Sequence, residues 1–416
     1  MSSGDGYSRH LVYLVEAQVS SAVSQLRVMA PAEACGVTVE TLTGKDAEAV
    51  PRGEFHFRSG SMLLVHRCVY RQYSRYRQLV QSAVRQGVPI VYDVDDLLLN
   101  VADEHPDRRY FEKSLASTLE ATLHADLITV SSEPLKRALS HFHPHIEVIP
   151  NRLPPKAWEL LGNARTRKSS SAPQGLRVGY VGTRSHYHDL SQIAPALRAV
   201  LDSHRDVTFV CYGFEPPPPL ASLPNAVVIE PTKAACRDYL VYAAEAACLG
   251  LDIVLAPLAD SEFNRCKSLI KMLEYGAMGV AAVYARMEPY AAGVSDGVTG
   301  LLAGSPAEWR NGLDRLIREP NLRRAIGEAA HRQVQDQGLL PAGADTWRSA
   351  WCRAAAIAKA APRPFEVSPA RDLITMMRQT MAYQQRTVEQ HRWRQKMERL
   401  ASRVRRLFQR KPRRAA

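Results

Sequence analysis

The sequence predicts an α/β protein with two successive Rossmann-like domains, each built on a parallel sheet, followed by a basic helical tail. Short apolar runs alternate with stretches of helical periodicity. The runs are nearly continuous, as expected for parallel strands that helices cover on both faces. The alternation is interrupted once, by a stretch rich in Ser, Arg and Gly, and then restarts. The 416 residues are enough for two domains of about 150–200 residues.

Residues 1–162 form the predicted first domain, in which short apolar strands are separated by helical stretches. The predicted strands are His10–Val15, Ser61–His66, Val88–Asp93, Ala125–Ser131 and His145–Asn151. A helix that ends near Arg85 is expected after the second of them. Residues 163–175 are predicted to be a linker, because Ser, Lys, Pro and Gly become frequent there.

Residues 176–345 repeat the pattern and form the predicted second domain. Its predicted strands are Leu176–Gly182, Val207–Gly213, Ala226–Glu230, Leu251–Leu258 and Val280–Tyr284, with Gly300–Leu302 as an edge strand. Helices are expected from Trp309 to Gln335. In sheets of this kind ligands bind beyond the carboxyl ends of the strands, so two facing sheets would enclose a cleft.

The stretch from Phe263 to Gly279 carries the most informative pattern of the chain, and its helix is predicted to begin near Lys267. A helix N-terminus offers free backbone N–H groups and the positive end of the dipole, which suit a phosphate. Lys267 and Lys271 are four residues apart on one predicted helix face, and Glu274 follows three residues later. We interpret this pattern as a cradle for a nucleotide diphosphate, in which Glu274 accepts hydrogen bonds from the ribose. The alternative is a solvated face with weak ion pairs.

Three segments of the chain resemble a known family: Ala125–Asn151, Gly179–Leu190, and Lys267–Tyr275 together with Pro289–Tyr290 and Asp296–Leu302. They make residues 8–345 similar to the GT-B glycosyltransferases, in particular to the large retaining group often called family four. The resemblance implies a GT-B fold, a nucleotide-sugar held mainly by the second domain, and a glycan or lipid-linked acceptor held by the first. It implies no metal or other cofactor, and a crossover helix at residues 346–362 that returns to the first domain.

The resemblance also implies which residues bind the donor. They are Gly182, Thr183, Arg184, Lys267, Ser268, Leu269, Lys271 and Glu274. Glu274 matches the second motif glutamate of the family, whereas Cys266 stands where its first glutamate lies. Arg184, His186 and His188 stand where many relatives have an Arg and a Lys that neutralise the leaving diphosphate. His186 is therefore a candidate catalytic residue, and the alternative for both histidines is a surface turn.

Three carboxylates, Asp93, Asp95 and Asp96, follow a strand of the first domain. Asp93-Val94-Asp95 has the form of the DxD metal motif of the other large glycosyltransferase fold, but two carboxylates are weak evidence for a metal site, so none is predicted. We predict that Asp95 and Asp96, ahead of Asp93, are catalytic residues that accept a proton from the acceptor or bind its hydroxyl groups. The alternative is a helix N-cap. Weaker candidates are His66 with Arg67 at the cleft, and Ser24 with Arg27 for an acceptor phosphate.

The tail, residues 363–416, is predicted to be a basic amphipathic helix. Residues 391–416 contain eleven Lys and Arg and one Glu, which gives +10 of the net charge of +12. Trp393, Met397, Leu400, Val404 and Leu407 form an apolar stripe. This pattern favours binding of the tail to an anionic membrane surface. The alternative is a coiled coil that joins subunits. RNA binding rests on charge alone, so no nucleic acid is expected.

The location is predicted to be cytoplasmic, with peripheral contact to the inner face of the plasma membrane through the tail. No apolar run approaches about 20 residues, and the N-terminus lacks the pattern of a signal peptide. The seven cysteines include no CxxC pair, which is typical of reduced thiols.

The function predicted from these observations is sugar transfer from a nucleotide-sugar to a glycan or lipid-linked acceptor, in bacterial cell-surface polysaccharide synthesis. Because Cys266 departs from the family pattern, an alternative is an inactive GT-B scaffold that serves as a binding or regulatory partner. A second alternative is a GT-B epimerase, which would interconvert sugar nucleotides without any acceptor.

Overall fold

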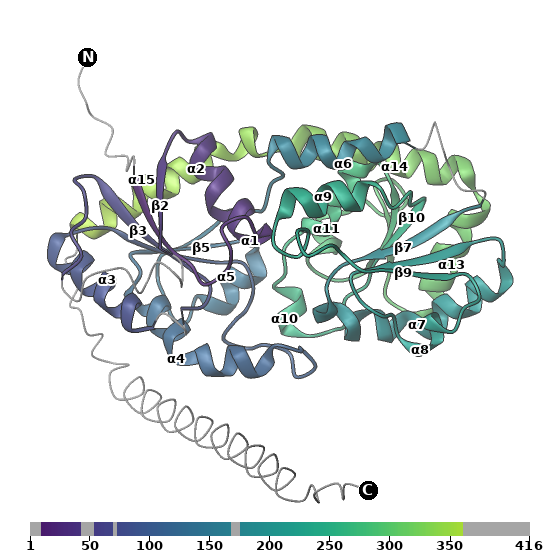
Figure 1. Cartoon of the computed structure of the whole chain (residues 1–416), viewed down its shortest axis with the longest axis horizontal. Helices are drawn as coiled ribbons and strands as arrows, with labels where there is room; N and C mark the ends of the chain where they lie inside the picture. Colours follow the sequence, from purple (N-terminus) through teal and green to yellow (C-terminus); the bar gives the residue numbers. More distant parts are fainter. Residues whose placement is uncertain (1–9, 43–53, 70–72, 168–174, 361–416) are drawn as a thin grey trace, which may run out of the picture. The chain divides into compact units, whose positions relative to one another are not determined.

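The computed structural model describes residues 10–42, 54–69, 73–167 and 175–360, which form two α/β lobes with one parallel six-stranded sheet each (Figure 1). The predicted fold class is confirmed for this part of the chain. The predicted tail, residues 363–416, lies outside the described residues. Its proposed contacts with a membrane or a second subunit therefore stay predictions.

The first sheet has the strand order β2-β1-β3-β4-β5-β6, and every neighbouring pair is parallel. Its strands are β1 (His10–Leu14), β2 (Thr38–Leu42), β3 (Ser61–His66), β4 (Ile90–Val94), β5 (Leu127–Val130) and β6 (Ile146–Val148). The sequence predicted all of them except β2. This strand lies at the sheet edge, so most of its side chains are only partly buried and it lacks a continuous apolar run.

The second sheet has the order β12-β11-β10-β7-β8-β9, again with parallel pairs. Its strands are β7 (Arg177–Val181), β8 (Thr208–Tyr212), β9 (Ala226–Ile229), β10 (Ile253–Ala256), β11 (Ala281–Ala285) and β12 (Leu301–Ala303). All six were predicted, and the predicted edge strand is the edge strand β12. The order reverses direction between β7 and β10, which is where ligands bind in such sheets.

Helices connect the strands and pack on the two sheets. In the first lobe they are α1 (Ala22–Ser24), a π-helix (Gln25–Met29), α2 (Ala30–Ala34), α3 (Tyr73–Gln86), α4 (Arg108–His124) and α5 (Glu133–Leu139). The second lobe contains a 3-10 turn (Arg184–His186), α7 (Tyr187–Ser203), α8 (Pro218–Ala221), α9 (Tyr239–Ala247), α10 (Glu262–Arg265), α11 (Ile270–Met278), α12 (Tyr290–Gly293), α13 (Pro306–Arg318) and α14 (Pro320–Gln337). The predicted helix ending near Arg85 is α3.

The predicted linker at residues 163–175 begins too early, because helix α6 (Pro155–Arg167) continues through its first five positions. Ala157 and Leu161 are fully buried, and Ala164 packs against the same core of the second lobe. The apolar face of α6 lies on α9 and α11. Burial of this face keeps the helix intact in a stretch whose composition alone favours a turn.

The last described helix, α15 (Ala344–Ala360), follows a 3-10 turn (Leu340–Gly343) and packs against β4 and β5 of the first sheet (Figure 1). Trp347 and Trp351 anchor it, since both are buried in one cluster with Leu11 and Tyr13 of β1. The chain thus returns to its first lobe after it has completed the second.

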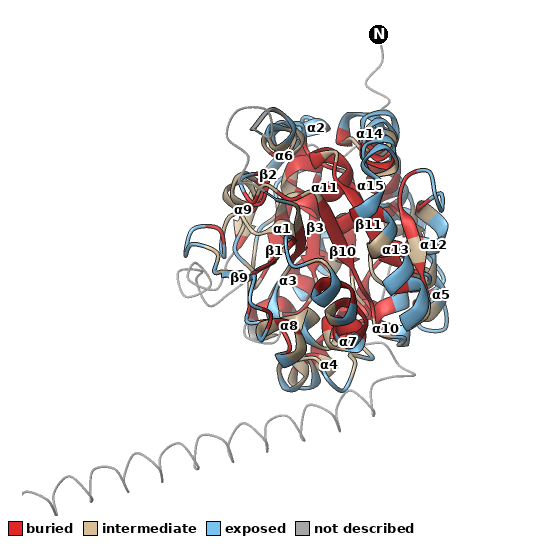
Figure 2. Cartoon of the chain, turned by 90° about the vertical axis from the view of Figure 1, so that its right-hand side faces the viewer, coloured by how far each residue is buried: buried red, intermediate tan, exposed pale blue. Residues whose placement is uncertain are grey.

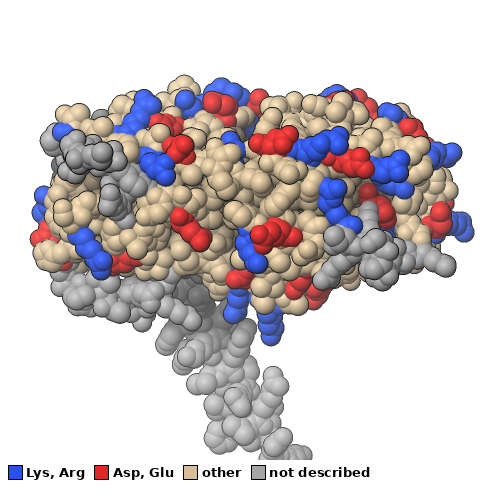
Figure 3. All heavy atoms as spheres, turned by 90° about the horizontal axis from the view of Figure 1, so that it is seen from above, with Lys and Arg blue, Asp and Glu red and all other residues tan. Residues whose placement is uncertain are grey.

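The cores of both lobes are the sheets themselves, whose inner strands are buried, while the edge strands β2 and β9 are only partly buried and the outer faces of the helices are exposed (Figure 2). All six residues of β3 are buried. Acidic and basic side chains are interspersed on the face shown in Figure 3. This mixture agrees with the sequence, which concentrates the excess of positive charge in residues 391–416.

Candidate active site

A cavity of about 670 Å³ is lined by residues that follow the carboxyl ends of strands in both sheets. Its lining from the first lobe includes Arg67 after β3, Asp95 and Asp96 after β4, and Asn151 after β6. The second lobe contributes Gly182, Thr183, Ser185 and His186 after β7, and Lys267, Ser268, Lys271 and Glu274 after β10. Nine of the predicted site residues, Asp95 among them, therefore come together with Arg67 and Asn151 in one place.

The helix behind the predicted phosphate cradle begins later than expected. Helix α11 begins at Ile270 with Leu269 as its N-cap, so Lys267 precedes the helix and does not share a helix face with Lys271. The short helix α10, capped by the Ser261 hydroxyl, occupies the residues before Cys266 and delays the start of α11. Lys267 still lines the cavity, and its Nζ lies 4.8 Å from the ring centroid of Phe263.

Lys271 and Glu274 lie one turn apart on α11 and form the charged wall of the second lobe. Lys271 is only 7% exposed, donates a hydrogen bond to the Val181 carbonyl, and lies 5.1 Å from the centroid of the Tyr180 ring. Burial lowers the pKa of Lys271 to about 8. Burial raises the pKa of Glu274, although Lys271 acts in the opposite direction. Buried ionisable groups that face a cavity are typical of functional sites.

Two glycines allow the strand ends of the second lobe to lie close to this wall. Gly213, after β8, has φ +114°, and a Cβ there would lie 1.7 Å from the Gly182 carbonyl oxygen. A Cβ at Gly182 would lie 3.0 Å from Nζ of Lys271. Glycine at both positions therefore leaves the space beside the Lys271 ammonium open to a ligand.

Of the residues in the loop after β7, some line the cavity and others do not. Thr183 and Ser185 line the cavity, and their hydroxyl oxygens lie 2.7 Å apart. Arg184, by contrast, is exposed and does not line the cavity, so the structure does not place it with the other residues predicted to bind the donor. It lies in the 3-10 turn between Thr183 and Ser185, both of which line the cavity. Leu269 lines a second cavity of about 430 Å³ instead.

His186 lines the main cavity and is held by a carboxylate from the first turn of α7, which follows it. Its Nδ1 lies 2.7 Å from Oδ2 of Asp189. Burial lowers the pKa of His186 to about 4, and the nearby Lys267 acts in the same direction. His186 therefore lies in a turn, as the alternative predicted, but its side chain lines the cavity. His188 contacts Gln192 on the exposed side of α7 and does not line the cavity.

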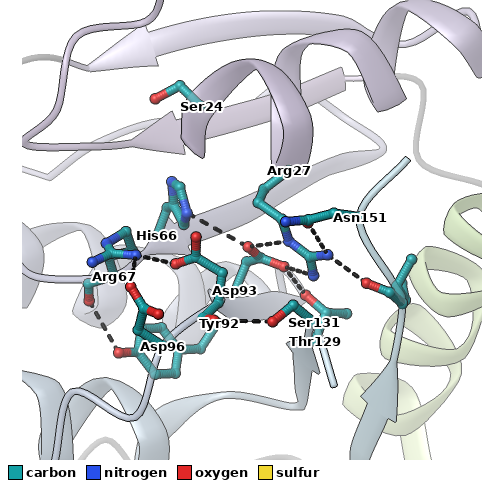
Figure 4. Close-up of polar contacts among 12 residues, drawn as sticks. Ser24, Arg27, His66, Arg67, Tyr92, Asp93, Asp96, Thr129, Ser131 and Asn151 are labelled. Carbon is teal, nitrogen blue, oxygen red and sulfur yellow. Dashed lines mark hydrogen bonds and ion pairs between the residues drawn. The ribbon is translucent and has the colours of Figure 1, made fainter. Parts of the chain in front are cut away.

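The wall of the first lobe is a charged group made by Arg67, Asp95 and Asp96, and Figure 4 shows Arg67 beside Asp96. The Arg67 guanidinium is hydrogen-bonded to both carboxylates, with Nη1 2.9 Å from Oδ2 of Asp96. Although burial opposes it, Lys267 and Arg67 lower the pKa of Asp96 to about 2. Arg67 has φ +55°, the one positive value of a non-glycine residue in the described ranges. Strained backbone of this kind tends to occur at functional sites.

The N-cap alternative for Asp95 and Asp96 is wrong. In the described chain, the next helix after these residues is α4, which begins at Arg108. Asp95 is fixed instead through its backbone, since its carbonyl accepts a hydrogen bond of 2.9 Å from the Ser131 hydroxyl. Both aspartates are therefore presented to the cavity by a loop.

Three weaker predictions fail, because the residues concerned are buried behind this wall (Figure 4). Arg27 and Ser24 are 0% exposed, so they cannot meet an acceptor phosphate in this structure. Arg27 instead binds the buried Asp93 carboxylate through two hydrogen bonds of 2.8 and 3.1 Å. His66 is 1% exposed and contacts the Tyr13 hydroxyl at 2.9 Å, so it does not reach the cavity.

Cys266 does not occupy the position that a donor-binding glutamate would need. It is 2% exposed and packs, with Phe263, into the apolar core of the first lobe. Burial raises the pKa of its thiol to about 12. Its carbonyl accepts a hydrogen bond from the Ser132 hydroxyl at 2.8 Å. Cys266, the residue that departs from the family pattern, thus makes an apolar contact between the lobes.

Asn151 and Asp189 also belong to the site, although neither was predicted from the sequence. Asn151 lines the cavity, and Asp189 holds His186. The spacing of three between His186 and Asp189 was a usable signal, because residues three apart on a helix are neighbours. No pattern near Asn151 pointed to its contacts, which come from residues distant in the chain.

The sequence matches no protein-family model, and no curated protein is similar to it by sequence. Solved structures share its fold. HepE of Anabaena, solved with UDP-glucose, has a TM-score of 0.56 and 13% identity over 82% of this chain and 98% of HepE. Sucrose-phosphate synthase of Thermosynechococcus elongatus has a TM-score of 0.54 and 14% identity over 82% of this chain and 97% of its own.

WaaG, a glycosyltransferase involved in lipopolysaccharide biosynthesis, has a TM-score of 0.54 and 12% identity over 82% of this chain and 98% of WaaG. These likenesses span both lobes and nearly the whole length of each neighbour. The chain therefore has the GT-B fold that the sequence predicted, with its cavity at the strand ends of both lobes.

Two further predictions concern membranes and metals. Across the described ranges, no helix is long and apolar enough to cross a membrane. The same residues contain no group of three or more His, Cys, Asp or Glu that could hold a metal ion. The prediction of a metal-independent reaction stays a prediction.

Proposed function

We propose that this protein is a glycosyltransferase that transfers a sugar from a nucleotide-sugar to a glycan or lipid-linked acceptor. The observation that carries the proposal is that Lys271 and Glu274 are both buried and both line a cavity between two sheets of GT-B topology. A lysine kept in an apolar site beside a ligand cavity provides a positive charge that water does not screen. The negative charge of a nucleoside diphosphate would complement this lysine.

In the proposed complex, the diphosphate lies between the loop after β7 and the start of α11. Gly182 leaves room for it, and Thr183 and Ser185 donate hydrogen bonds from their hydroxyl groups. Lys267 and Lys271 provide positive charge, and the first N–H groups of α11 add the positive end of the helix dipole. Glu274 accepts hydrogen bonds from the ribose, as the family resemblance implies.

The same groups lower the barrier to transfer. Negative charge grows on the diphosphate as the bond to the sugar breaks, and fixed positive groups stabilise that charge more in the transition state than in the ground state. Lys267, Lys271 and His186 are the residues that we assign to this task. The cavity positions them before the substrate binds.

The acceptor is proposed to bind at the wall of the first lobe. Asp95 and Asp96 can accept hydrogen bonds from its hydroxyl groups, and Arg67 holds both carboxylates in place. With a pKa of about 2, Asp96 is a weak base, whereas a phosphate group has a second pKa near 6. The departing diphosphate is therefore the better proton acceptor, which supports the proposed retention of anomeric configuration.

The setting that we propose is the cytoplasmic face of a bacterial membrane, in cell-surface polysaccharide synthesis. The basic tail predicted for residues 363–416 supports contact with anionic lipid. WaaG, which has the same fold, is involved in lipopolysaccharide biosynthesis. Peripheral attachment would bring a lipid-linked acceptor to the first lobe.

The proposal is tested by thermal-shift measurements with UDP, GDP, ADP, CMP and their common sugar conjugates, without metal. One nucleotide should raise the melting temperature, and Glu274→Ala should abolish the rise. Glu159→Ala, which removes an exposed glutamate of α6 with a side chain 64% exposed, is the matched control and should keep it.

Transfer of sugar to an acceptor extract should then require the same nucleotide-sugar and fail with Glu274→Ala. Nucleotide binding without transfer or hydrolysis would favour the inactive-scaffold alternative. Interconversion of the sugar nucleotide without acceptor would favour the epimerase. No shift with any nucleotide would contradict the proposal.

A further inference from the structure

His186 and Asp189 form a histidine–carboxylate pair at the wall of the cavity. Nδ1 of His186 lies 2.7 Å from Oδ2 of Asp189. The other oxygen of Asp189, Oδ1, accepts two hydrogen bonds of 2.8 Å, from the Ala259 backbone N–H and from Nδ2 of Asn264. Asp189 therefore cannot turn away from the histidine without losing both of these bonds. It also joins the loop after β7 to the loop after β10, and both loops line the cavity.

This geometry fixes the tautomer of His186. An ionised carboxylate only accepts hydrogen bonds, so Nδ1 must carry the hydrogen that points at Asp189. In the neutral ring, Nε2 then has a free lone pair. Nε2 has no hydrogen-bond partner among the residues that the structure describes. The ring can bind a phosphate oxygen through Nε2 only after this nitrogen gains a proton.

Charged groups from three other segments face His186. Lys267 precedes α11, and Lys271 lies in its first turn, whereas Asp96 follows β4 in the first lobe. The two ammonium groups act against protonation of the ring, while Asp189 and Asp96 act in its favour. Burial adds to the effect of the lysines, and together they lower the pKa of His186 to about 4. The ring is therefore neutral at pH 7 when the cavity holds no anion.

We propose that His186 takes up a proton from solution when a nucleoside diphosphate binds, and that Asp189 is the positioning residue that makes this uptake necessary. The inference rests on the proposed function, since it takes the diphosphate to lie beside Lys267 and Lys271. Two or three negative charges there outweigh the two lysines and favour the imidazolium. The imidazolium donates through Nε2 to a phosphate oxygen and through Nδ1 to Asp189, and no other bond is made or broken.

The direction of the pH dependence follows from linkage. Binding raises the pKa of His186, so the diphosphate is bound more tightly as pH falls through the pKa of the bound state, down to about 4 in the free protein. Lys271, whose pKa is about 8 in the free protein, is already protonated near pH 6.5. A measurement at pH 6.5 thus separates His186 from Lys271.

The test is isothermal titration calorimetry of the full chain with UDP at pH 6.5, in two buffers of different ionisation enthalpy. UDP and Glu274 can also exchange protons, so the quantity to compare is the difference between variants. The wild type should take up more protons than His186→Gln, by a large fraction of one proton per UDP. His186→Gln should also bind UDP about tenfold more weakly, as expected for a lost hydrogen bond between charged groups.

His188→Gln is the matched control. His188 lies two residues away on the exposed side of α7 and does not line the cavity. It should leave both the affinity for UDP and the proton uptake unchanged. If His188→Gln and His186→Gln behave alike, the effect belongs to the surface charge of α7 and the inference is wrong.

Asp189→Asn tests the positioning role. Its amide oxygen can keep the bonds from Ala259 and Asn264, so its NH₂ group would face Nδ1 of His186 and donate to it. The neutral ring would then carry its hydrogen on Nε2 and bind phosphate without gaining a proton. Asp189→Asn should lose the extra proton uptake but keep UDP binding within a few fold, and the ¹⁵N shifts of His186 should show the exchanged tautomer.

The outcomes separate this inference from the proposed function. Failure of the wild type to bind UDP or any other nucleoside diphosphate contradicts the proposed function. Binding with equal proton uptake by the wild type and His186→Gln overturns only the inference. Uptake that persists in Asp189→Asn with the tautomer unchanged overturns the role of Asp189.

Discussion

Nδ2 of Asn151 donates a hydrogen bond to the Ser268 hydroxyl at 2.9 Å, and this bond ties the first lobe to the loop that precedes α11. The same amide accepts, through Oδ1, a hydrogen bond of 3.1 Å from Arg27. Arg27 is in turn bound to Asp93 inside the first sheet. A chain of polar contacts thus runs from the core of the first lobe to the proposed diphosphate site. Figure 4 shows its part from Asp93 through Arg27 to Asn151.

Asn151→Ala is expected to weaken donor binding, and it should also lower the free energy of unfolding because the buried Arg27 guanidinium loses an acceptor. Without the amide, Ser268 loses its anchor and the loop that carries Lys267 is less well positioned. Loss of one hydrogen bond costs about 0.5–1.5 kcal/mol, so we expect a three- to tenfold rise in the dissociation constant for the nucleotide, measured by calorimetry.

The control for this prediction is Asn100→Ala. Asn100 also makes a hydrogen bond between the lobes, to Glu262 at 2.8 Å, but it is exposed and does not line the cavity. It should leave nucleotide affinity unchanged. Equal effects of the two variants would mean that any contact between the lobes matters, and that Asn151 has no special place in the site.

Lys271 should set the alkaline limit of the reaction. Its pKa of about 8 in the free protein means that the ammonium form is lost as pH rises through 8. The ammonium form is the one that binds the diphosphate, so kcat/KM should fall more steeply above this pH than below it, where only the proton uptake by His186 contributes a slope. Lys271→Arg keeps the charge to much higher pH and should remove the fall.

The measurement is the pH profile of kcat/KM between pH 6 and 10. Lys271→Met, of similar length but uncharged, should lower kcat/KM about 100-fold or more at pH 7, as expected for loss of a group that stabilises a charged transition state. A wild-type profile that stays flat to pH 10 would show that Lys271 does not act as this cation.

Arg27→Met should affect stability rather than the chemistry of transfer. Arg27 and Asp93 are both completely buried, and removal of one partner leaves the other charge without compensation. Such changes cost about 3–5 kcal/mol. Urea unfolding should show this loss, while kcat per folded molecule changes by less than the effect of Lys271→Met.

Arg85→Met provides the comparison, because Arg85 forms an ion pair with Glu54 at the surface. Its loss should change the free energy of unfolding far less than Arg27→Met does, because water screens an exposed ion pair. If Arg27→Met left stability intact and removed acceptor turnover, the predicted role of Arg27 at an acceptor phosphate would be restored.

Much of the fold could be predicted from the sequence because parallel strands buried on both faces are short, apolar and continuous. The strand β3 is such a run, and its predicted and observed bounds agree. The strand β2 was missed because an edge strand needs no such run. The start of α11 was misplaced by three residues, because the Ser261 cap creates the extra helix α10 and periodicity alone does not reveal it.

The site was predicted less completely, for a different physical reason. Lys271 and Glu274 share one helix, so their spacing in sequence determines their proximity. Asn151 and Ser268 meet only because the two lobes pack together. Burial also decides which charge is available: Arg27 and Arg67 both follow strands near the site, yet one is enclosed by Asp93 and the other faces the cavity.

Cys266→Glu should not improve the enzyme, although it restores the residue type that the resembled family carries at this position. The side chain of residue 266 points into the apolar core of the first lobe, beside Phe263, and away from the cavity. An ionised carboxylate there would be desolvated and unpaired, at a cost of several kcal/mol. We expect a large loss in the free energy of unfolding and no gain in kcat.

Cys266→Ala isolates the packing term, because it removes only the sulfur and introduces no charge. It should cost about 1–2 kcal/mol, in line with the removal of a small buried group. Donor affinity should remain within a factor of two, since the thiol does not line the cavity. A rise in kcat with Cys266→Glu would show that residue 266 turns toward the donor sugar during turnover. In that case the cavity described by this structure would not be the reactive arrangement of the two lobes.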